Sequence, residues 1–252
     1  MFNPFTLENK TILITGASSG IGRQCAIDCS KMGAKVVLVA RKEERLIETL
    51  SYMVGEGHLV CPYDLNNLDG IKGLVSGVVS SIGKLDGFIH SAGIEVTKPL
   101  QLLTVEDYET VLRVNTLSGF EFVHQLASIK NMNKGGAIVL IASISGVIGR
   151  GSVAAYSASK GALISACRSM ALEFAKKQIR VNCISPGTVL TPLMQSFLET
   201  LDEEKRARRI EGFPLGLGET SDISNACIYL LSDASCWVTG QNLIVDGGYT
   251  AK

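Results

Sequence analysis

Tyr156 and Lys160 are four residues apart, a spacing that places both side chains on one face of a helix, one turn from each other. A tyrosine, with an ordinary pKa of about 10, becomes a useful acid near neutral pH when a nearby ammonium stabilises its phenolate. A tyrosine and a lysine at this spacing often occur by chance, so the neighbouring residues decide whether the pair indicates an active site. Ser143 closes the apolar run Ala137–Ala142, where its hydroxyl could hold a substrate oxygen. Together these residues suit proton transfer to a developing alkoxide.

A second group with chemical potential is the glycine-rich stretch Thr15–Gly22, which follows the expected strand Thr11–Thr15. Its three glycines let the backbone approach a pyrophosphate, and a helix beginning near Gly20 would aim free N–H groups at that anion. Glycines also collect in turns and caps for local reasons. Here, however, a strand precedes them and a helix follows. This context indicates a dinucleotide-binding unit, with spacing GxxxGxG rather than GxGxxG.

The end of the second expected strand, Lys35–Ala40, bears on the choice of dinucleotide. An acidic residue there usually binds the ribose 2′-hydroxyl of NAD, and this chain has Arg41 instead. Arg41 could contact a 2′-phosphate, which favours NADP(H) over NAD(H). The alternative is a solvated cation at a helix start, next to Glu43 and Glu44. Asp64 is placed to accept from the adenine amino group, to cap a helix, or both.

Short apolar segments alternate with longer helical patterns along the whole chain, which predicts an α/β fold. Several strands are apolar on both faces, as expected for a parallel sheet covered on both sides. We therefore expect residues 1–252 to form a single domain with a Rossmann fold, a doubly wound, seven-stranded parallel sheet flanked by helices. The predicted strands are Thr11–Thr15, Lys35–Ala40, His58–Cys61, Gly87–Ser91, Ala137–Ala142, Arg180–Ile184 and Asn242–Asp246.

Residues 188–217 fit this alternation least well, since they contain Pro192, Pro214 and the charged run Asp202–Arg209. They could form a surface helical pair with one buried stripe. Their position after the carboxyl end of a strand favours a second interpretation, a lid over a substrate cleft.

The composition of the chain argues against several classes of function. Acidic and basic residues balance at 24 each in the 252 residues, which argues against nucleic acid or a membrane surface as partner. The N-terminal segment lacks the pattern of a signal peptide, and no apolar run could span a bilayer. The seven cysteines form no CxxC pair, and the three histidines are not at ligand spacing to them. We expect no metal site, and inert buried thiols in a cytoplasmic protein.

Taken together, these motifs resemble those of the short-chain dehydrogenase/reductase family, from about Leu7 to Gly248. In general pattern the chain is most similar to the 3-oxoacyl-[acyl-carrier-protein] reductases. The residues that carry the resemblance are Thr15–Gly22, Asp64, Ser91–Gly93, Asn115, Ser143, Tyr156–Lys160, Arg180–Asn182, Pro186–Thr191 and Asp246–Gly248.

The resemblance implies four catalytic residues. Tyr156 would be the general acid and base, Lys160 would lower its pKa, and Ser143 would polarise the carbonyl. Asn115 would hold a water in a proton relay through Lys160. With Arg41, the cofactor-binding residues would be Gly16, Ser18, Ser19, Gly20, Ile21, Gly22, Asp64, Leu65, Ser91, Ala92, Gly93, Tyr156, Lys160, Pro186, Gly187, Val189 and Thr191.

One departure from the family pattern is His90-Ser91-Ala92-Gly93, where Asn-Asn-Ala-Gly is usual. Ser91 can still reach the cofactor ribose, but we expect the support of the central sheet to differ.

The expected function is NADP(H)-dependent interconversion of a ketone and a secondary alcohol. We expect a mostly apolar cleft with Arg150 as the one fixed charge of residues 145–151, which would favour a 3-oxoacyl thioester over a sugar. The alternatives are reduction of another small ketone or sugar, or a non-catalytic NADP(H)-binding sensor. The resemblance implies a homotetramer (or homodimer) that pairs helices around 103–126 and 154–175. The expected cleft walls are Ile144, Val147, Ile148, Val189, Leu193, Met194 and Phe197.

Overall fold

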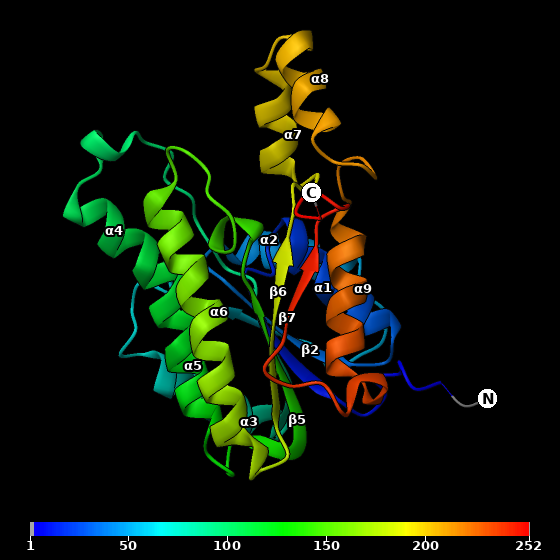
Figure 1. The fold of residues 1–252 in the computed structure, drawn as a ribbon. Coiled ribbons are helices and arrows are strands. Elements are labelled where there is room, and N and C mark those ends of the chain that lie inside the picture. The colour runs from blue at the N-terminus through cyan, green and yellow to red at the C-terminus, as the bar shows by residue number, and fades with distance from the viewer. Residues whose placement is uncertain (1–2, 252) are drawn as a thin grey trace.

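A computed structural model describes residues 3–251. Its centre is the predicted seven-stranded parallel sheet, and the strand order is β3-β2-β1-β4-β5-β6-β7 (Figure 1). The strands are β1 (Thr11–Thr15), β2 (Lys35–Ala40), β3 (Leu59–Pro62), β4 (Leu85–His90), β5 (Met132–Ile141), β6 (Arg180–Pro186) and β7 (Asn242–Val245).

Five of the seven strands differ from their predicted bounds: β3, β4 and β5 at both ends, β6 by two more residues at its end and β7 by one fewer. β4 and β5 begin earlier because Leu85 pairs with Met132 before an irregularity in register. Gly135, with φ +83°, lies within that irregular stretch, and no apolar pattern announces it. β3 begins one residue later than predicted, because the ring of His58 accepts a hydrogen bond from the Val36 amide at 3.1 Å.

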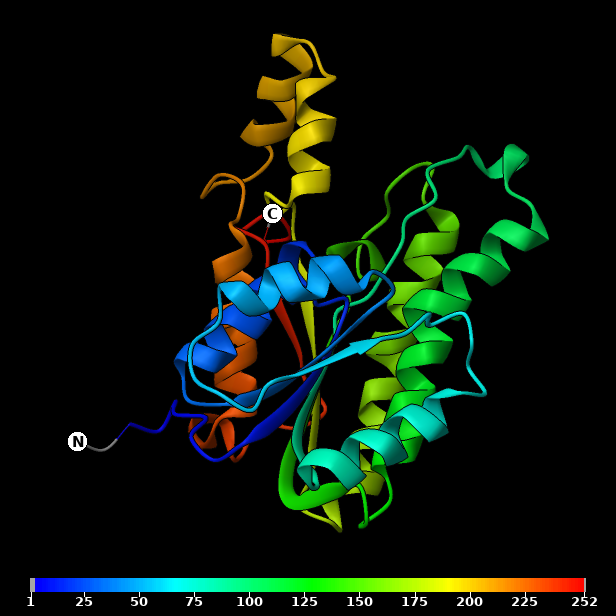
Figure 2. The same ribbon diagram turned by 180° about the vertical axis from the view of Figure 1, so that it is seen from behind.

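Helices cover both faces of the sheet (Figures 1 and 2). Alternate side chains of each strand point to opposite faces, so one strand feeds two apolar cores. Leu13 of β1 packs into one core, whereas its neighbour Ile14 packs into the other. The helices on the first face are α3 (Ile71–Ile82), α4 (Val105–Leu112), α5 (Ser118–Leu126) and α6 (Ala154–Ala175), and those on the second are α1 (Gly20–Lys31), α2 (Glu43–Ser51) and α9 (Thr220–Leu231).

The strand order reverses between β1 and β4, and doubly wound sheets bind ligands at such a switch point. The loops after these two strands approach closely. A Cβ on Gly16, whose φ is +71°, would lie 2.8 Å from the Ala92 amide nitrogen. Only glycine therefore fits there.

Between α4 and α5 the chain makes a π-helical turn, Arg113–Leu117, which contains Asn115. Such turns are rare and often occur at functional sites, because the extra residue redirects backbone groups. This turn brings Asn115 against α6 and the loop after β4.

The segment 188–217 folds as two short helices, α7 (Pro192–Glu199) and α8 (Glu203–Glu211), which project beyond the carboxyl end of the sheet (Figure 1). Local caps define both. Thr191 accepts a hydrogen bond from the Met194 amide, and Asp202 accepts one from the Lys205 amide. Burial adds little, since α7 buries Leu198 and α8 buries no residue.

The seven cysteines are free, and five are buried. Cys236 is exposed and Cys61 half-buried, so the expectation of uniformly buried thiols is wrong for these two. No helix within residues 3–251 is long and apolar enough to cross a membrane.

Candidate active site

Ser143 and Tyr156 meet at the carboxyl end of β5. Ser143 directly follows Ala142 in extended conformation and caps a short 3-10 turn, Ile144–Gly146, where its Oγ accepts a hydrogen bond from the Ser145 amide at 3.1 Å. Tyr156 lies in the first turn of α6 and is hydrogen-bonded to Ser143. The two hydroxyls therefore flank one position beside the end of the sheet.

Lys160 lies one helical turn after Tyr156, as the spacing predicts, and only 3% of it is exposed. Its Nζ donates to the Ile141 carbonyl at 2.8 Å and lies 5.7 Å from the centre of the Tyr156 ring. Burial lowers the pKa of Lys160 to about 8. The amine can therefore lose or keep its proton close to neutral pH.

The pKa of Tyr156 is raised from its ordinary value, chiefly by burial. The hydrogen bond with Ser143 opposes this shift, whereas the negative charge of Glu95 adds to it. The depression implied by the family resemblance therefore stays a prediction for the assembled, cofactor-bound enzyme.

Both amide protons of the Asn115 side chain are used. Its Oδ1 accepts from the Ile94 amide at 2.7 Å, while its Nδ2 donates to the Ile94 carbonyl and to Ser159 Oγ. A water in a proton relay would therefore have to donate to Asn115, either at its backbone carbonyl or at the second lone pair of Oδ1.

His90, the departure from the family pattern, bonds to that same carbonyl. The ring is completely buried, with Nε2 3.1 Å from the Asn115 carbonyl oxygen and Nδ1 2.9 Å from Thr15 Oγ1. Since a carbonyl only accepts, Nε2 carries the proton and Nδ1 accepts from Thr15. A Cβ on Gly119 would lie 2.7 Å from the ring, so glycine makes room for it. His90 thus ties β1 to the π-helical turn.

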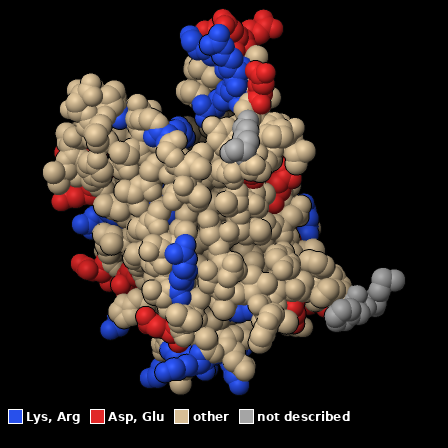
Figure 3. Space-filling model, in the orientation of Figure 1, with Lys and Arg blue, Asp and Glu red and all other residues tan. Residues whose placement is uncertain are grey.

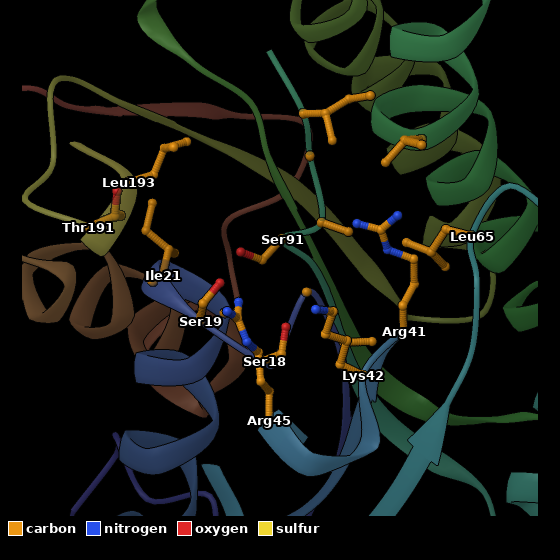
Figure 4. A pocket seen from close by; sticks show the side chains of 18 of the residues that line it. Ser18, Ser19, Ile21, Arg41, Lys42, Arg45, Leu65, Ser91, Thr191 and Leu193 are labelled. Atoms are coloured by element: carbon orange, nitrogen blue, oxygen red, sulfur yellow. The ribbon is translucent and has the colours of Figure 1, made fainter. Parts of the chain in front are cut away.

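A large pocket of about 730 Å³ runs along the switch point (Figure 4). The loop before α1 forms one wall and the end of β2 forms another. Thirteen of the eighteen predicted cofactor residues line it: Gly16, Ser18, Ser19, Gly20, Ile21, Gly22, Arg41, Asp64, Leu65, Ser91, Ala92, Gly93 and Thr191.

The other predicted cofactor residues lie elsewhere. Tyr156, Lys160, Pro186 and Val189 do not line this pocket, and Gly187 lines the neighbouring cavity described below. The prediction also missed lining residues, above all Lys42 and Arg45. Their signal was present in the sequence, because both are cations within four residues of Arg41.

The pocket fits a dinucleotide. α1 has no side-chain cap at its N-terminus, so its free N–H groups can bind a pyrophosphate. Gly22 keeps the backbone there tight, because a Cβ would lie 2.3 Å from the Gly16 carbonyl oxygen. Asp64 accepts from the Asn66 amide at 3.0 Å, so a local turn uses at least one of its oxygens.

A second cavity, of about 220 Å³, begins at Ser143 and ends at α8. Of the apolar residues expected around the substrate, only Ile144 and Ile148 line it, and three arginines do so as well. Arg150 lines the cavity, as expected for the one fixed charge of residues 145–151. The expectation of a mostly apolar cleft did not include Arg208 and Arg209 of α8, which line the same cavity.

Comparisons with known proteins agree with this geometry. A family model described as enoyl-(acyl carrier protein) reductase matches residues 16–250. Glucose 1-dehydrogenase of Gluconobacter oxydans is 34% identical over 96% of this chain and 92% of its own length. 3-Oxoacyl-[acyl-carrier-protein] reductase of Thermotoga maritima is 34% identical over 96% and 98%.

Solved structures give the same result. A 7α-hydroxysteroid dehydrogenase in complex with NADH and 7-oxoglycochenodeoxycholic acid superposes with a TM-score of 0.90 at 30% identity, covering 98% of each chain. The chain belongs to the short-chain dehydrogenase/reductase family, whose members are NAD(P)(H)-dependent oxidoreductases acting on CH–OH groups.

Proposed function

We propose that the chain is an NADP(H)-dependent oxidoreductase that interconverts a ketone and a secondary alcohol. The observation that carries this proposal is the meeting of Ser143 and Tyr156 above the buried amine of Lys160, beside a pocket that fits a dinucleotide. An acid, a hydrogen-bond donor and a cation gathered at the carboxyl end of a parallel sheet suit carbonyl reduction.

The nicotinamide, when bound, supplies or accepts the hydride. Tyr156 donates its phenolic proton to the carbonyl oxygen as that oxygen gains negative charge, and the hydroxyl of Ser143 holds the same oxygen. The ammonium of Lys160 stabilises the phenolate that remains. In the oxidation direction, the phenolate accepts the alcohol proton. Asn115 positions Ile94 and Ser159, and its backbone carbonyl or its Oδ1 is the acceptor at which a proton relay would continue.

The charge at the end of β2 supports NADP(H) over NAD(H). Arg41, Lys42 and Arg45 line the pocket there, and no acidic side chain ends β2. Three cations would favour a 2′-phosphate, whereas a plain ribose would gain little from them.

Replacement of Tyr156 by phenylalanine tests this mechanism. Tyr156→Phe keeps the ring and removes the transferable proton, so kcat should fall about 10²–10⁴-fold while NADPH binding remains. Tyr52→Phe is the matched control, because Tyr52 is exposed and far along the chain from the site. Near wild-type kcat in Tyr156→Phe would remove Tyr156 from the mechanism. A wild-type chain that binds NADPH but reduces no ketone would instead fit a non-catalytic sensor.

The relatives do not favour one substrate class over another. Relatives whose names specify a 3-oxoacyl carrier-protein reductase and a glucose dehydrogenase have the same identity to this chain. The apolar cleft that would favour a 3-oxoacyl thioester has no support in the lining of the second cavity.

We further propose a homotetramer in the cytoplasm, with α7 and α8 as the substrate-cleft lid. Exposed apolar side chains support the assembly: Leu172 of α6, one of the helices expected to pair, is 77% exposed, and Trp237, shortly before β7, is 97% exposed. Burying such surfaces between subunits would be favourable. Sedimentation velocity should give a tetramer or dimer at micromolar concentration, and a stable monomer would reject this assembly.

A further inference from the structure

The second cavity continues directly from the reacting position. Ser143 and the segment Ile148–Arg150 form one side, and Arg209 and Phe213, at the end of α8 and just after it, form the other. Its volume of about 220 Å³ is below the 300–1,000 Å³ range typical of drug-sized ligands, so it suits a small substrate. A substrate bound in this cavity would extend from its reacting carbonyl toward α8.

Two of its three arginines already have carboxylate partners. Arg150 donates to Glu95 at 2.8 Å, and Arg208 donates to Glu204 at 2.6 Å. Arg209 differs. No hydrogen bond or ion pair joins its side chain to another residue in the range 3–251, and its Nε is buried without a partner. Arg209 therefore has no direct carboxylate partner at the cavity wall.

Arg209 is nevertheless held in place. Its guanidinium lies over the Phe197 ring, 5.2 Å from the ring centre, which orients the planar group. Burial and then the positive charge of Arg150 lower the pKa of Arg209, and the electrostatic effects of Glu95 and Tyr249 oppose this only in part. Figure 3 shows other basic side chains gathered on the projecting α7–α8 unit, with acidic ones near its tip. An anion in the cavity would relieve this unfavourable electrostatic arrangement.

We propose that the substrate carries a carboxylate, which Arg209 binds through its guanidinium fork while the reacting carbonyl lies at Ser143 and Tyr156. The fork matches a carboxylate in a two-hydrogen-bond geometry. Ile144 and Ile148 line the space between the two ends, which suits a short carbon chain.

This inference rests on the proposed ketone reduction and names its substrate class as small oxo acids and hydroxy acids. In reduction, the keto carbon gains a hydride from NADPH and its oxygen gains the Tyr156 proton. The carboxylate is unchanged, and the products are a hydroxy acid and NADP⁺. In oxidation the hydroxy acid loses both, and NADP⁺ is reduced.

The test compares each acid with its own neutral ester. The purified full chain is assayed with NADPH on short 2-oxo, 3-oxo and 4-oxo acids and on their methyl esters. For at least one pair, kcat/KM should be about tenfold or more higher for the acid, because a charged hydrogen bond is lost in the ester. Arg209→Ala should lower kcat/KM for that acid by about 10- to 100-fold and leave the ester unchanged.

Two further variants separate charge from fold. Arg209→Lys keeps the charge and loses the fork, so it should lie between wild type and Arg209→Ala. Arg206→Ala changes an exposed arginine of the same helix that does not line the cavity, and it should match wild type. An unchanged NADPH dissociation constant in Arg209→Ala shows that the variant is folded.

The outcomes distinguish a failure of the proposed carboxylate site from a failure of the proposed ketone reduction. Equal loss on acid and ester in Arg209→Ala, or esters reduced as well as acids by wild type, would overturn the carboxylate while the reductase stands. Activity confined to phosphorylated ketones or coenzyme A thioesters would replace the carboxylate by a phosphate. If no ketone of any charge is reduced, the proposed function itself fails.

Discussion

The reaction centre and the α7–α8 unit are held in very different ways. Ser143 and Lys160 are buried at the junction of β5 and α6, and Asn115 is completely enclosed by the loop after β4. Hydrogen bonds to backbone fix each of them: Ser143 to the 3-10 turn that it caps, Lys160 to β5, and Asn115 to the loop after β4. By contrast, α8 buries no side chain and relies on a cap and on ion pairs between exposed residues.

This difference separates chemistry from recognition. Proton transfer needs groups held within a fraction of an ångström, and rigid strands and packed helices supply that precision. The substrate recognition that we propose for Arg209 would lie on a unit with few core contacts, which can change its side chains without disturbing the sheet. Arg209 lies on this weakly packed unit, near the end of α8.

The largest effect that we predict lies in the buried half, at His90. Its pKa is lowered from 6.5 to about 3 by burial and by the charge of Lys160. The unfolded chain binds a proton below pH 6.5, whereas the folded chain does not until about pH 3. The contribution of His90 to stability is therefore complete well above pH 6.5 and is lost as the pH falls, by about 2 kcal/mol at pH 5 and about 4 kcal/mol at pH 3.

Urea denaturation between pH 7.5 and pH 5 measures this loss, above the range in which carboxylates titrate. His90→Asn, which restores the usual family residue, should remove most of the slope. His124→Asn is the control, because His124 is exposed. A slope that persists in His90→Asn would show that another group responds to pH.

The same division explains what the sequence could predict. Buried strands appear in the sequence as apolar runs, and the loop before α1 appears as a set of closely spaced glycines. The sheet and much of the dinucleotide pocket could therefore be located from the sequence. Arg209 could not, because a charged run looks the same whether it faces water or a cavity. His90 was noticed as a departure, but its bonds to Thr15 and Asn115 depend on the π-helical turn, which has no sequence signal.

A smaller effect is expected at Arg41, an exposed side chain whose position is set by the buried strand β2. Arg41→Asp would place an anion beside the 2′-phosphate. The ratio of NADPH to NADH affinity should fall about 10- to 100-fold. Fluorescence titration with both cofactors measures this ratio, and Lys72→Asp, outside the pocket on α3, controls for the change in net charge. An unmoved ratio would make Arg41 a surface cation.

The smallest effect on stability should come from Leu193 of α7, a helix that contains both an exposed and a buried leucine. Leu193 is 80% exposed and lines the large pocket, whereas Leu198 is 4% exposed. Urea denaturation of Leu193→Ala should show a change within about 0.5 kcal/mol, against about 2–5 kcal/mol for Leu198→Ala. If α7 closes over bound cofactor, Leu193→Ala should still raise the KM for NADPH, because the leucine would then lose apolar contact. An unchanged KM for NADPH would show that α7 is only a surface helix and would reject its proposed role as a lid.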